Sequence, residues 1–303
     1  MNVGKIGVLA GGDSKEREIS LKSGTAVYNA LKEKGCDVKL IDMVSDDDAI
    51  LDTLDVHVAF VALHGGFGEN GTVQGKLEKR KIPYTGSDQR SSSIAMNKIT
   101  SRQLFQNGEI PVPKYYLVKK DCHFGRLKGF GVPVVVKPIT EGSSIGLSVV
   151  RNIDAFPQAL EEAFRYGDTV IVEKYIDGKE LTVGIFEDKA LPVIEIVSKD
   201  NVYNYSAKYM DSETEYIVPA KIDDKTKDKA CELALKAHKI LGCRDFSRVD
   251  MRMDNKGVIY VLEINTVPGL TERSLLPKAA NAIGIGFGDL CLKLVDLAAK
   301  RKK

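Results

Sequence analysis

The sequence predicts an α/β protein that begins with a parallel-sheet βαβ domain. Its 303 residues exceed the size of about 250–300 residues at which one hydrophobic core stops growing, so two or three domains are expected. Hydrophobic residues make up 43% of the chain, which is enough for packed cores and too much for disorder. In the first third, apolar runs alternate with an amphipathic helix, a rhythm typical of a parallel sheet covered on both faces.

The first third contains three predicted strands. Residues 5–10 form an apolar run that ends in two glycines, and residues 38–41 and 56–63 form the second and third strands. The helix between the first two strands ends at Gly35, a residue suited to the left-handed position after a helix. Right-handed crossovers then bring the loops after the first and third strands to the same edge of the sheet.

The rest of the chain predicts shorter strands and a change of domain. Residues 110–113 contain two prolines, which cannot continue a helix. The later elements, in chain order, are a helix at 92–106, strands at 134–137, 147–150 and 170–175 with a helix at 154–165, a polar segment at 198–215, a helix at 224–241 and a hairpin at 246–265. We expect domains at 1–95, 96–180 and 181–303.

Composition argues against several classes of protein. The 44 basic and 42 acidic residues give a net charge of +2, unlike a nucleic-acid binder with its basic stripe. The only basic run, residues 300–303, is interpreted as a solvated helix end. No apolar stretch approaches the ~20 residues that span a bilayer, and we expect no signal peptide. The five scattered cysteines disfavour a disulfide scaffold or a zinc site and indicate a reducing, cytoplasmic setting.

The sharpest chemical signal lies in the predicted hairpin. If its turn is centred after position 255, four polar residues share one face: Arg248, Asp250, Glu263 and Asn265. Arg248 then lies opposite Glu263, and the Cβ atoms of Asp250 and Glu263 lie ~7–8 Å apart as diagonal neighbours. These oxygen donors suit Mg²⁺ rather than zinc. The alternative is a structural Arg248–Glu263 salt bridge, but the sharp turn at 266–270, with backbone N–H groups for an anion, favours the metal site.

Four further segments have both a functional and a structural interpretation. Residues 141–146 form a Gly/Ser loop beside Lys137 that could wrap phosphates, although such loops are often plain turns. His64 ends a buried strand, where it is better placed to touch a ligand than to fill the core, the structural alternative. Glu16 could hold an amino group, although acids at a helix start also stabilise the helix dipole. Residues 206–209 could belong to a lid or to an ordinary surface loop.

Residues 66–71 match the pattern G-x-G-x-x-G, but we interpret the match as coincidental. The pattern follows the third strand instead of the first, and it lacks the acidic residue expected about 20 positions later. The chain also has no G-x-x-x-x-G-K-[ST] element, which disfavours a P-loop fold. A nicotinamide-dependent oxidoreductase that uses this loop stays as an alternative of another class.

Together these motifs resemble the D-alanine–D-alanine ligase family of the ATP-grasp superfamily, over essentially the whole chain and in the family's order. The matching segments are residues 11–12, 16–20, 64–71, 141–146, 207–209, 248–250 and 263–269. The resemblance implies an ATP-grasp fold with an α+β nucleotide-binding part. It also implies ATP-dependent ligation of two D-alanines through a D-alanyl phosphate, for peptidoglycan precursors. Another ATP-grasp carboxylate–amine ligase is the related alternative.

The resemblance implies a role for each candidate residue. ATP would lie between the central and C-terminal domains, held at its phosphates by Lys98 and Lys137, at its adenine by Glu173, Lys174 and Ile176, and at its ribose by Glu180. Two Mg²⁺ (or Mn²⁺) ions would be bound by Asp250, Glu263 and Asn265. The first D-alanine would be held by Glu16, His64, Arg248 and the Gly269 backbone, and the second framed by Ser274, Leu275, Lys208 and Tyr209. A hydrogen-bonded set would join Glu16, Ser143 and Tyr209.

The resemblance has local departures and implies partners. Asn70 stands where many relatives have aspartate, and Glu272 and Arg273 bring charges near the second-substrate pocket. Tyr209 resembles the dipeptide-forming members, so D-alanine is the expected second substrate in place of D-lactate. We expect ATP and D-alanine as small-molecule partners, a homodimer as in relatives, and neither nucleic acid nor membrane as a partner.

Overall fold

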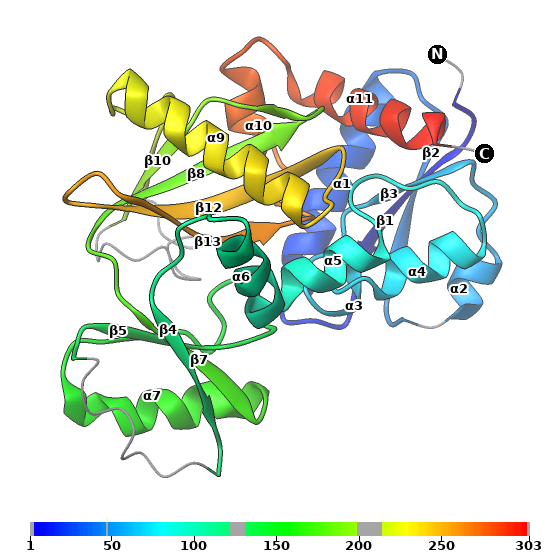
Figure 1. The fold of residues 1–303 in the computed structure, drawn as a ribbon. Coiled ribbons are helices and arrows are strands. Elements are labelled where there is room, and N and C mark those ends of the chain that lie inside the picture. Colours follow the sequence, from blue (N-terminus) through cyan, green and yellow to red (C-terminus); the bar gives the residue numbers. More distant parts are fainter. Residues whose placement is uncertain (1–2, 47, 122–130, 199–213, 302–303) are drawn as a thin grey trace.

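The computed structural model describes residues 3–46, 48–121, 131–198 and 214–301 (Figure 1). The expected lid residues Lys208 and Tyr209 lie outside these ranges. The described strands form three separate sheets, one parallel and two antiparallel.

The N-terminal part is the predicted βαβ unit. Its elements are β1 (Ile6–Gly11), α1 (Arg17–Glu33), β2 (Val38–Met43), α2 (Asp48–Asp52), β3 (Val58–Val61), α3 (Gly66–Glu69) and α4 (Thr72–Lys79). The strand order is β2-β1-β3 with parallel pairing, and every residue of β1 is buried. The loops after β1 and β3 meet as expected, because the Ser14 hydroxyl donates to the His64 carbonyl at 2.7 Å. The parallel sheet and the meeting of these two loops at one edge are therefore confirmed.

The single helix predicted at 92–106 is wrong, because the chain breaks there into α5 (Gln89–Met96) and α6 (Lys98–Asn107). Asn97 has an extended backbone, and its side chain accepts hydrogen bonds from the N–H groups of Ile99 and Thr100. Asparagine is among the best N-cap residues, so it starts a second helix in the middle of an otherwise continuous pattern. The break places Lys98 in the first turn of α6, with its ammonium donating to the carbonyl of Glu141.

The central part is a small antiparallel sheet in the order β4-β7-β5-β6. Its elements are β4 (Tyr115–Lys119), β5 (Val134–Pro138), β6 (Ser148–Val150), α7 (Phe156–Ala163) and β7 (Thr169–Lys174), with 3₁₀ turns at Ile153–Ala155 and Phe164–Tyr166. Figure 1 shows α7 lying across one face of this sheet. The sheet and α7 share a hydrophobic core of their own.

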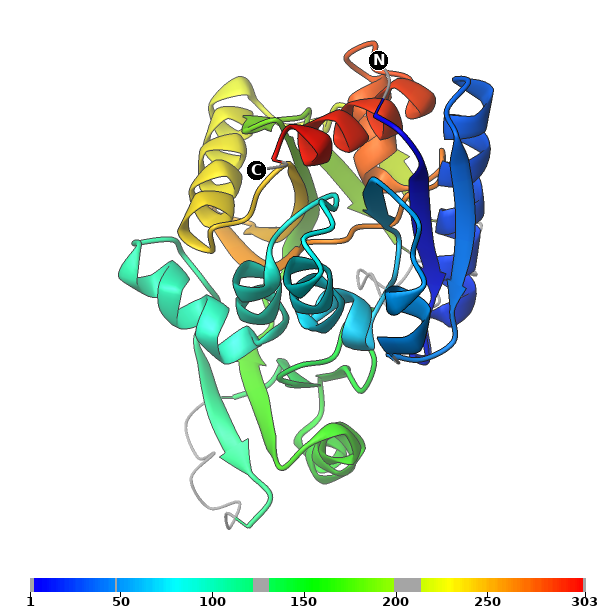
Figure 2. The same cartoon turned by 90° about the vertical axis from the view of Figure 1, so that its right-hand side faces the viewer.

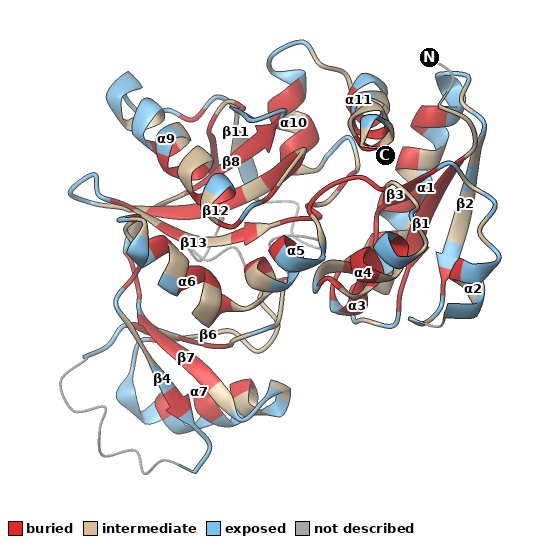
Figure 3. Cartoon of the chain, turned by 45° about the vertical axis from the view of Figure 1, so that its right-hand side comes forward, coloured by how far each residue is buried: buried red, intermediate tan, exposed pale blue. Residues whose placement is uncertain are grey.

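The C-terminal sheet has the order β11-β10-β8-β12-β13, with β9 paired to β8. Its strands and helices are β8 (Gly178–Phe186), β9 (Lys189–Ala190), β10 (Ile194–Val197), β11 (Glu215–Ile217), α9 (Asp224–Ile240), β12 (Phe246–Asp254), β13 (Ile259–Asn265), α10 (Leu275–Asn281) and α11 (Phe287–Lys300). Figure 3 shows buried residues along β8 and β12 at the centre of this sheet, whereas the outer turns of α9 are exposed.

The last helix packs the C-terminal part of the chain against the N-terminal part. Helix α11 packs against α1, so the first hydrophobic core contains residues of both the N-terminal and C-terminal parts (Figure 2). A second core joins α5 and α6 to the C-terminal sheet. The domain limits at 1–95, 96–180 and 181–303 stay a prediction.

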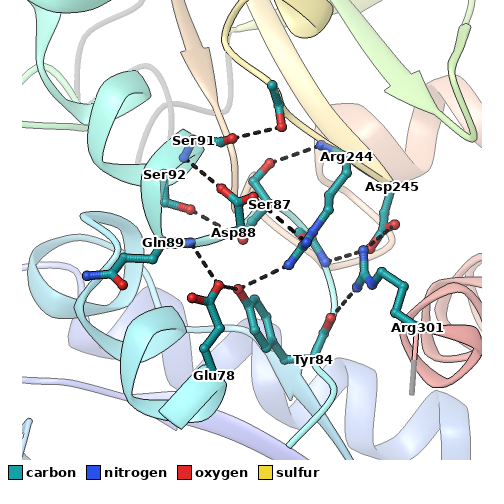
Figure 4. A network of polar contacts seen from close by, with 12 residues as sticks. Glu78, Tyr84, Ser87, Asp88, Gln89, Ser91, Ser92, Arg244, Asp245 and Arg301 are labelled. Carbon is teal, nitrogen blue, oxygen red and sulfur yellow. Dashed lines mark hydrogen bonds and ion pairs between the residues drawn. The ribbon is translucent and has the colours of Figure 1, made fainter. Parts of the chain in front are cut away.

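A polar network also ties these parts together (Figure 4). Arg301 at the end of α11 lies 2.7 Å from a carboxylate oxygen of Asp245, whose other oxygen accepts from the N–H of Gly86 at 2.9 Å. Arg244 donates to the Tyr84 hydroxyl at 3.1 Å. Burial raises the pKa of Asp245 against the opposing attraction of Arg301. Directional contacts thus supplement apolar packing where the N-terminal and C-terminal parts meet.

The helices and the cysteines bear on the class of protein. Among the described helices, none is long and apolar enough to cross a membrane. The four cysteines in the described ranges carry free thiols. Burial raises the pKa of Cys243 and Cys291 to about 12, which makes both thiols poor nucleophiles.

Candidate active site

A first cavity lies between the central sheet and strands β8, β12 and β13. All six described residues expected to contact ATP line it: Lys98, Lys137, Glu173, Lys174, Ile176 and Glu180. Asp250 and Glu263 line the same cavity from the hairpin. Three lysines therefore share one cavity with Asp250 and Glu263 of the hairpin, which places cations for a triphosphate beside carboxylates for its metal ion.

A second cavity adjoins the other side of the hairpin. The described residues expected to hold the amino acids line it, together with one expected metal ligand: Glu16, His64, Ser143, Arg248, Gly269, Ser274, Leu275 and Asn265. These residues come from the start of α1, the end of β3, the Gly/Ser loop, the hairpin strands β12 and β13, and the segment after β13. The hairpin therefore forms a wall common to both cavities.

The hairpin has a different register from the predicted one. Asp250 lies directly opposite Glu263, and Arg248 lies opposite Asn265. The predicted pairing was wrong by two positions, because the turn is centred on Lys256 and a β-bulge next to Asp250 adds a residue to β13. The two carboxylates nevertheless share a face, and as a direct pair they approach more closely than the predicted diagonal.

Arg248 forms an ion pair with Asp250 on the same strand. The Arg248 Nε and Nη2 atoms lie 2.8 and 2.7 Å from the two oxygens of Asp250. Asp250 also accepts from the Thr182 hydroxyl at 2.7 Å and from the Asn265 amide at 2.9 Å. Glu263 lies 3.5 Å from the ammonium of Lys98. Arg248, which lines the amino-acid cavity, is thus bound to Asp250, which lines the nucleotide cavity.

The donor set fits magnesium bound together with a nucleotide. Within the described ranges, no three His, Cys, Asp or Glu side chains cluster as a self-sufficient metal site. Mg²⁺ is usually held by one or two carboxylates, with phosphate oxygens and waters completing its octahedron. Asp250 and Glu263 supply two carboxylates, and Asn265, whose amide nitrogen faces Asp250, retains its amide oxygen as an acceptor.

A buried charge triad lies beside the nucleotide cavity. Glu173 is 3% exposed and forms ion pairs with Lys137 at 2.7 Å and with Arg102 at 2.6 Å. Burial alone would raise the pKa of Glu173, but the two cations lower it below its ordinary value. Burial also lowers the pKa of Lys137, and Arg102 adds to that decrease while Glu173 opposes it. The sequence analysis did not single out Arg102, because a basic residue on a polar-looking helix gives no signal of burial.

Glu16 and the Gly/Ser loop meet above the amino-acid cavity. The Ser143 hydroxyl donates to a carboxylate oxygen of Glu16, as the resemblance implies. Glu16 is 5% exposed and occupies the N-cap position of α1 without a capping hydrogen bond from its side chain, so the helix-dipole interpretation stays open beside the functional one. Ser143 and Ser144 have left-handed backbones, with φ of 46° and 59°, a strained conformation that often marks a functional loop.

His64 is fixed in orientation inside the same cavity. Its Nδ1 lies 3.1 Å from the carbonyl oxygen of Val267, and its Nε2 lies 2.9 Å from the hydroxyl of Ser23. Because a carbonyl can only accept, Nδ1 carries the proton in the neutral ring and Nε2 accepts from Ser23. Glu69 lies 3.4 Å from Nδ1 and also lines the cavity, a neighbour that the sequence analysis did not name as a site residue.

The segment after β13 bounds the pocket expected for the second substrate. Ser274 and Leu275 line it next to Gly269, and a Cβ built on Gly269 would lie only 3.0 Å from the Ser274 hydroxyl. Arg273 also lines this cavity, whereas Glu272 lines a separate groove beside α10. Of the two charges flagged in the sequence, the cation alone faces the amino-acid cavity.

The glycines at 66–71 serve close packing. Gly66 begins α3 and Gly71 precedes α4, and a Cβ built on Gly68 would lie 2.4 Å from the Cβ of Leu63. Neither Gly66, Gly68 nor Gly71 lines the nucleotide cavity described above. The structure thus favours the coincidental interpretation of the G-x-G-x-x-G match.

The fold and the paired cavities are those of an ATP-grasp ligase, in which two antiparallel sheets enclose a nucleotide and an adjoining pocket holds the molecules to be joined. Family models named "D-ala D-ala ligase N-terminus" and "D-ala D-ala ligase C-terminus" match residues 45–87 and 104–296. The D-alanine–D-alanine ligase of Geotalea uraniireducens is 46% identical over 297 residues, covering 97% of this chain and 96% of that relative. That of Geobacter sulfurreducens is 44% identical, covering 99% and 95%.

Solved structures agree with these sequence relatives. The D-alanine–D-alanine ligase of Bacillus anthracis, complexed with ATP, superposes with a TM-score of 0.86 at 35% identity, covering 98% of this chain and 97% of that one. The VanG D-Ala:D-Ser ligase of Enterococcus faecalis superposes with a TM-score of 0.85 at 30% identity, covering 97% and 99%. The chain belongs to the D-alanine–D-alanine ligase family, and the predicted ATP-grasp fold is confirmed.

Proposed function

We propose that this chain joins two D-alanines to D-alanyl-D-alanine, converting ATP to ADP and phosphate, in the synthesis of peptidoglycan precursors. The observation that carries the proposal is the shared wall. The Asp250–Glu263 pair faces the nucleotide cavity, and Arg248, bound to Asp250, faces the amino-acid cavity. A phosphoryl group in the first cavity is therefore brought next to a carboxylate in the second.

The nucleotide cavity binds and orients ATP. Lys98 and Lys137 neutralise its phosphate oxygens, Lys174 and Ile176 hold the adenine with Glu173, and Glu180 binds the ribose hydroxyls. Asp250, Glu263 and Asn265 would hold Mg²⁺ (or Mn²⁺), which would supply further neutralisation of charge on the transferring phosphoryl group. Because phosphoryl transfer depends mostly on position and electrostatics, these residues need only hold the γ-phosphate in line with the acceptor.

The amino-acid cavity holds the acceptor. Glu16, held by Ser143, binds the ammonium of the first D-alanine, while His64 and Arg248 orient its carboxylate. One carboxylate oxygen attacks the γ-phosphorus and ADP leaves, which gives the D-alanyl phosphate. The neutral amine of the second D-alanine then attacks the acyl carbon. The tetrahedral oxyanion is stabilised by Arg248 and the Gly269 N–H, and phosphate departs as the amide forms.

The second D-alanine binds between Gly269, Ser274 and Leu275. Arg273 lines the same cavity, and its guanidinium is suited to pair with the free carboxylate of the second D-alanine. D-Alanine is favoured over D-lactate on the identity of Tyr209 in the sequence. Lys208 and Tyr209 are proposed to frame this substrate and to shield the acyl phosphate from water.

The proposal also covers the cellular location, the oligomeric state and the domain limits of the chain. The chain is proposed to act in the cytoplasm, where ATP is available and thiols stay reduced. It is proposed to form a homodimer and to have domain limits at 1–95, 96–180 and 181–303. Sedimentation equilibrium tests the dimer, and limited proteolysis tests the limits.

A product assay tests the ligase activity. The purified chain is incubated with ATP, Mg²⁺ and D-alanine, and phosphate and dipeptide are measured together, with D-serine and D-lactate as competing second substrates. Equal amounts of phosphate and D-alanyl-D-alanine are expected. Phosphate release that requires a different amino acid would instead support another carboxylate–amine ligase of the same fold.

A further inference from the structure

We propose that Arg102 is a positioning residue for ATP, which acts by holding Glu173 so that Lys137 remains directed at the nucleotide cavity. The inference rests on the proposed function, because it assigns a role within the same site. Arg102 itself does not line the nucleotide cavity, so it acts through its neighbours.

Arg102 occupies an unusual place for an arginine. It is fully buried, and it is the largest fully buried side chain in the described ranges. From α6 its Nη2 atom reaches Glu173 on β7 at 2.6 Å and donates to the carbonyl of Leu262 on β13 at 3.3 Å. Its guanidinium also lies 5.6 Å from the ring centroid of Tyr115 on β4. One side chain thus spans both sheets that enclose the nucleotide.

A purely structural role explains this arrangement poorly. Burying an ion pair costs desolvation that the attraction between its members often fails to repay, and apolar residues of similar volume usually stabilise a core better. The Nε and Nη1 atoms of Arg102 have no hydrogen-bond partner among the described residues, which adds to that cost. A guanidinium retained under these conditions indicates that its charge is used.

The role of the Arg102 charge follows from how Arg102 and Lys137 share the carboxylate of Glu173. One oxygen faces Arg102, and the other lies 2.7 Å from the ammonium of Lys137. Without Arg102, the whole charge of Glu173 would be available to Lys137, which would then be neutralised locally and drawn away from the phosphates. With Arg102, the three side chains carry a net charge of +1, and Lys137 keeps attraction for a polyanion.

The inference makes a selective kinetic prediction. Replacement Arg102→Met keeps the length of the side chain and removes its charge, so KM for ATP should rise about tenfold, the usual effect of losing one charge-assisted interaction. KM for D-alanine should stay within twofold of wild type, because the amino-acid cavity is untouched. Arg102→Lys should restore most of the ATP affinity, since a lysine keeps the charge.

Matched variants separate positioning from stability. Arg80→Met removes another arginine that bridges Asp48 and Asp52 in the N-terminal part, and it should leave both KM values unchanged. If Arg102 acts through Glu173, then Glu173→Gln combined with Arg102→Met should raise KM for ATP by less than the product of the single effects. Thermal unfolding is measured on all variants.

Two results would overturn the inference. One is a KM for ATP within twofold of wild type in Arg102→Met, and the other is a parallel rise in KM for both substrates without rescue by lysine. If Arg102→Met fails to fold, Arg102→Gln is compared with Arg102→Lys by ATP titration in its place; the inference expects about tenfold weaker ATP binding for the uncharged variant alone, and equal ATP binding by the two variants would overturn it. Should wild type form no dipeptide, the proposed function fails, while ATP titration of the same variants still tests Arg102.

Discussion

His238 should make the protein lose stability in mild acid. The ring lies fully buried on α9, with Nδ1 2.7 Å from the hydroxyl of Ser247. Burial lowers its pKa from 6.5 to about 4, although Asp188 at 4.0 Å opposes the decrease. The folded state therefore prefers the neutral ring, and between pH 6.5 and about 4 the unfolded chain binds the extra proton.

The size of the effect follows from the shift. The pKa difference corresponds to a loss of about 3 kcal/mol in the free energy of unfolding, at about 1.4 kcal/mol per unit. The stability from His238 is complete above pH 6.5, falls as the pH drops, and is fully lost below about 4. Urea unfolding of wild type and His238→Gln at several pH values measures it. The variant should be less stable at pH 7 but have a flatter pH profile.

The control is His57→Gln, which changes an exposed histidine and retains His238. This control should keep the acid-dependent loss of wild type. Parallel profiles for wild type and His238→Gln between pH 4 and 6.5 would refute the reasoning, because acid destabilisation would then come from other groups.

Three variants test the proposed site. Glu263→Gln should abolish turnover, because it removes a carboxylate proposed to hold Mg²⁺. The melting temperature should stay near that of wild type, because the side chain is partly exposed and lies 3.5 Å from Lys98. Near-normal kcat at saturating Mg²⁺ would contradict this. Gly65→Ala should raise KM for D-alanine about tenfold, because the glycine has φ of +66° and its Cβ would lie 2.6 Å from a Glu16 oxygen; an unchanged KM would show that the loop adapts. Arg252→Met should reduce the preference for ATP over 2′-deoxy-ATP, because Arg252 lies 3.1 Å from Glu180, the residue proposed to bind the ribose hydroxyls. An unchanged preference in the variant would argue against that role for Glu180.

The elements with strong periodicity were predictable from the sequence. The parallel sheet followed from apolar runs bounded by glycines, and the end of α1 followed from Gly35, whose φ is 77°. Alternation along the hairpin was enough to place Asp250 and Glu263 on one face, since that conclusion holds for any register that shifts by an even number of residues.

Features that depend on competition between local contacts were not predictable. The pairing register depended on a bulge that no residue type announces, and the break at Asn97 depended on a side chain competing with the helix backbone. The burial of Arg102 arises only when strands distant in sequence close over α6. In the sequence, a buried arginine on a helix has the same charge, position and spacing as an arginine exposed to solvent, so its burial could not be predicted.

The bulge in β13 also determines how two chemical surfaces fit into one strand. Neighbouring residues of a regular strand point to opposite sides, yet Leu262 and Glu263 both line the nucleotide cavity. An aliphatic surface suited to a flat aromatic base therefore sits one position, about 3.3 Å along the chain, from an oxygen donor. Deleting this single residue would do more than shorten the strand. It would restore the regular alternation of β13, so the cavity would lose the aliphatic surface that now lies next to Glu263.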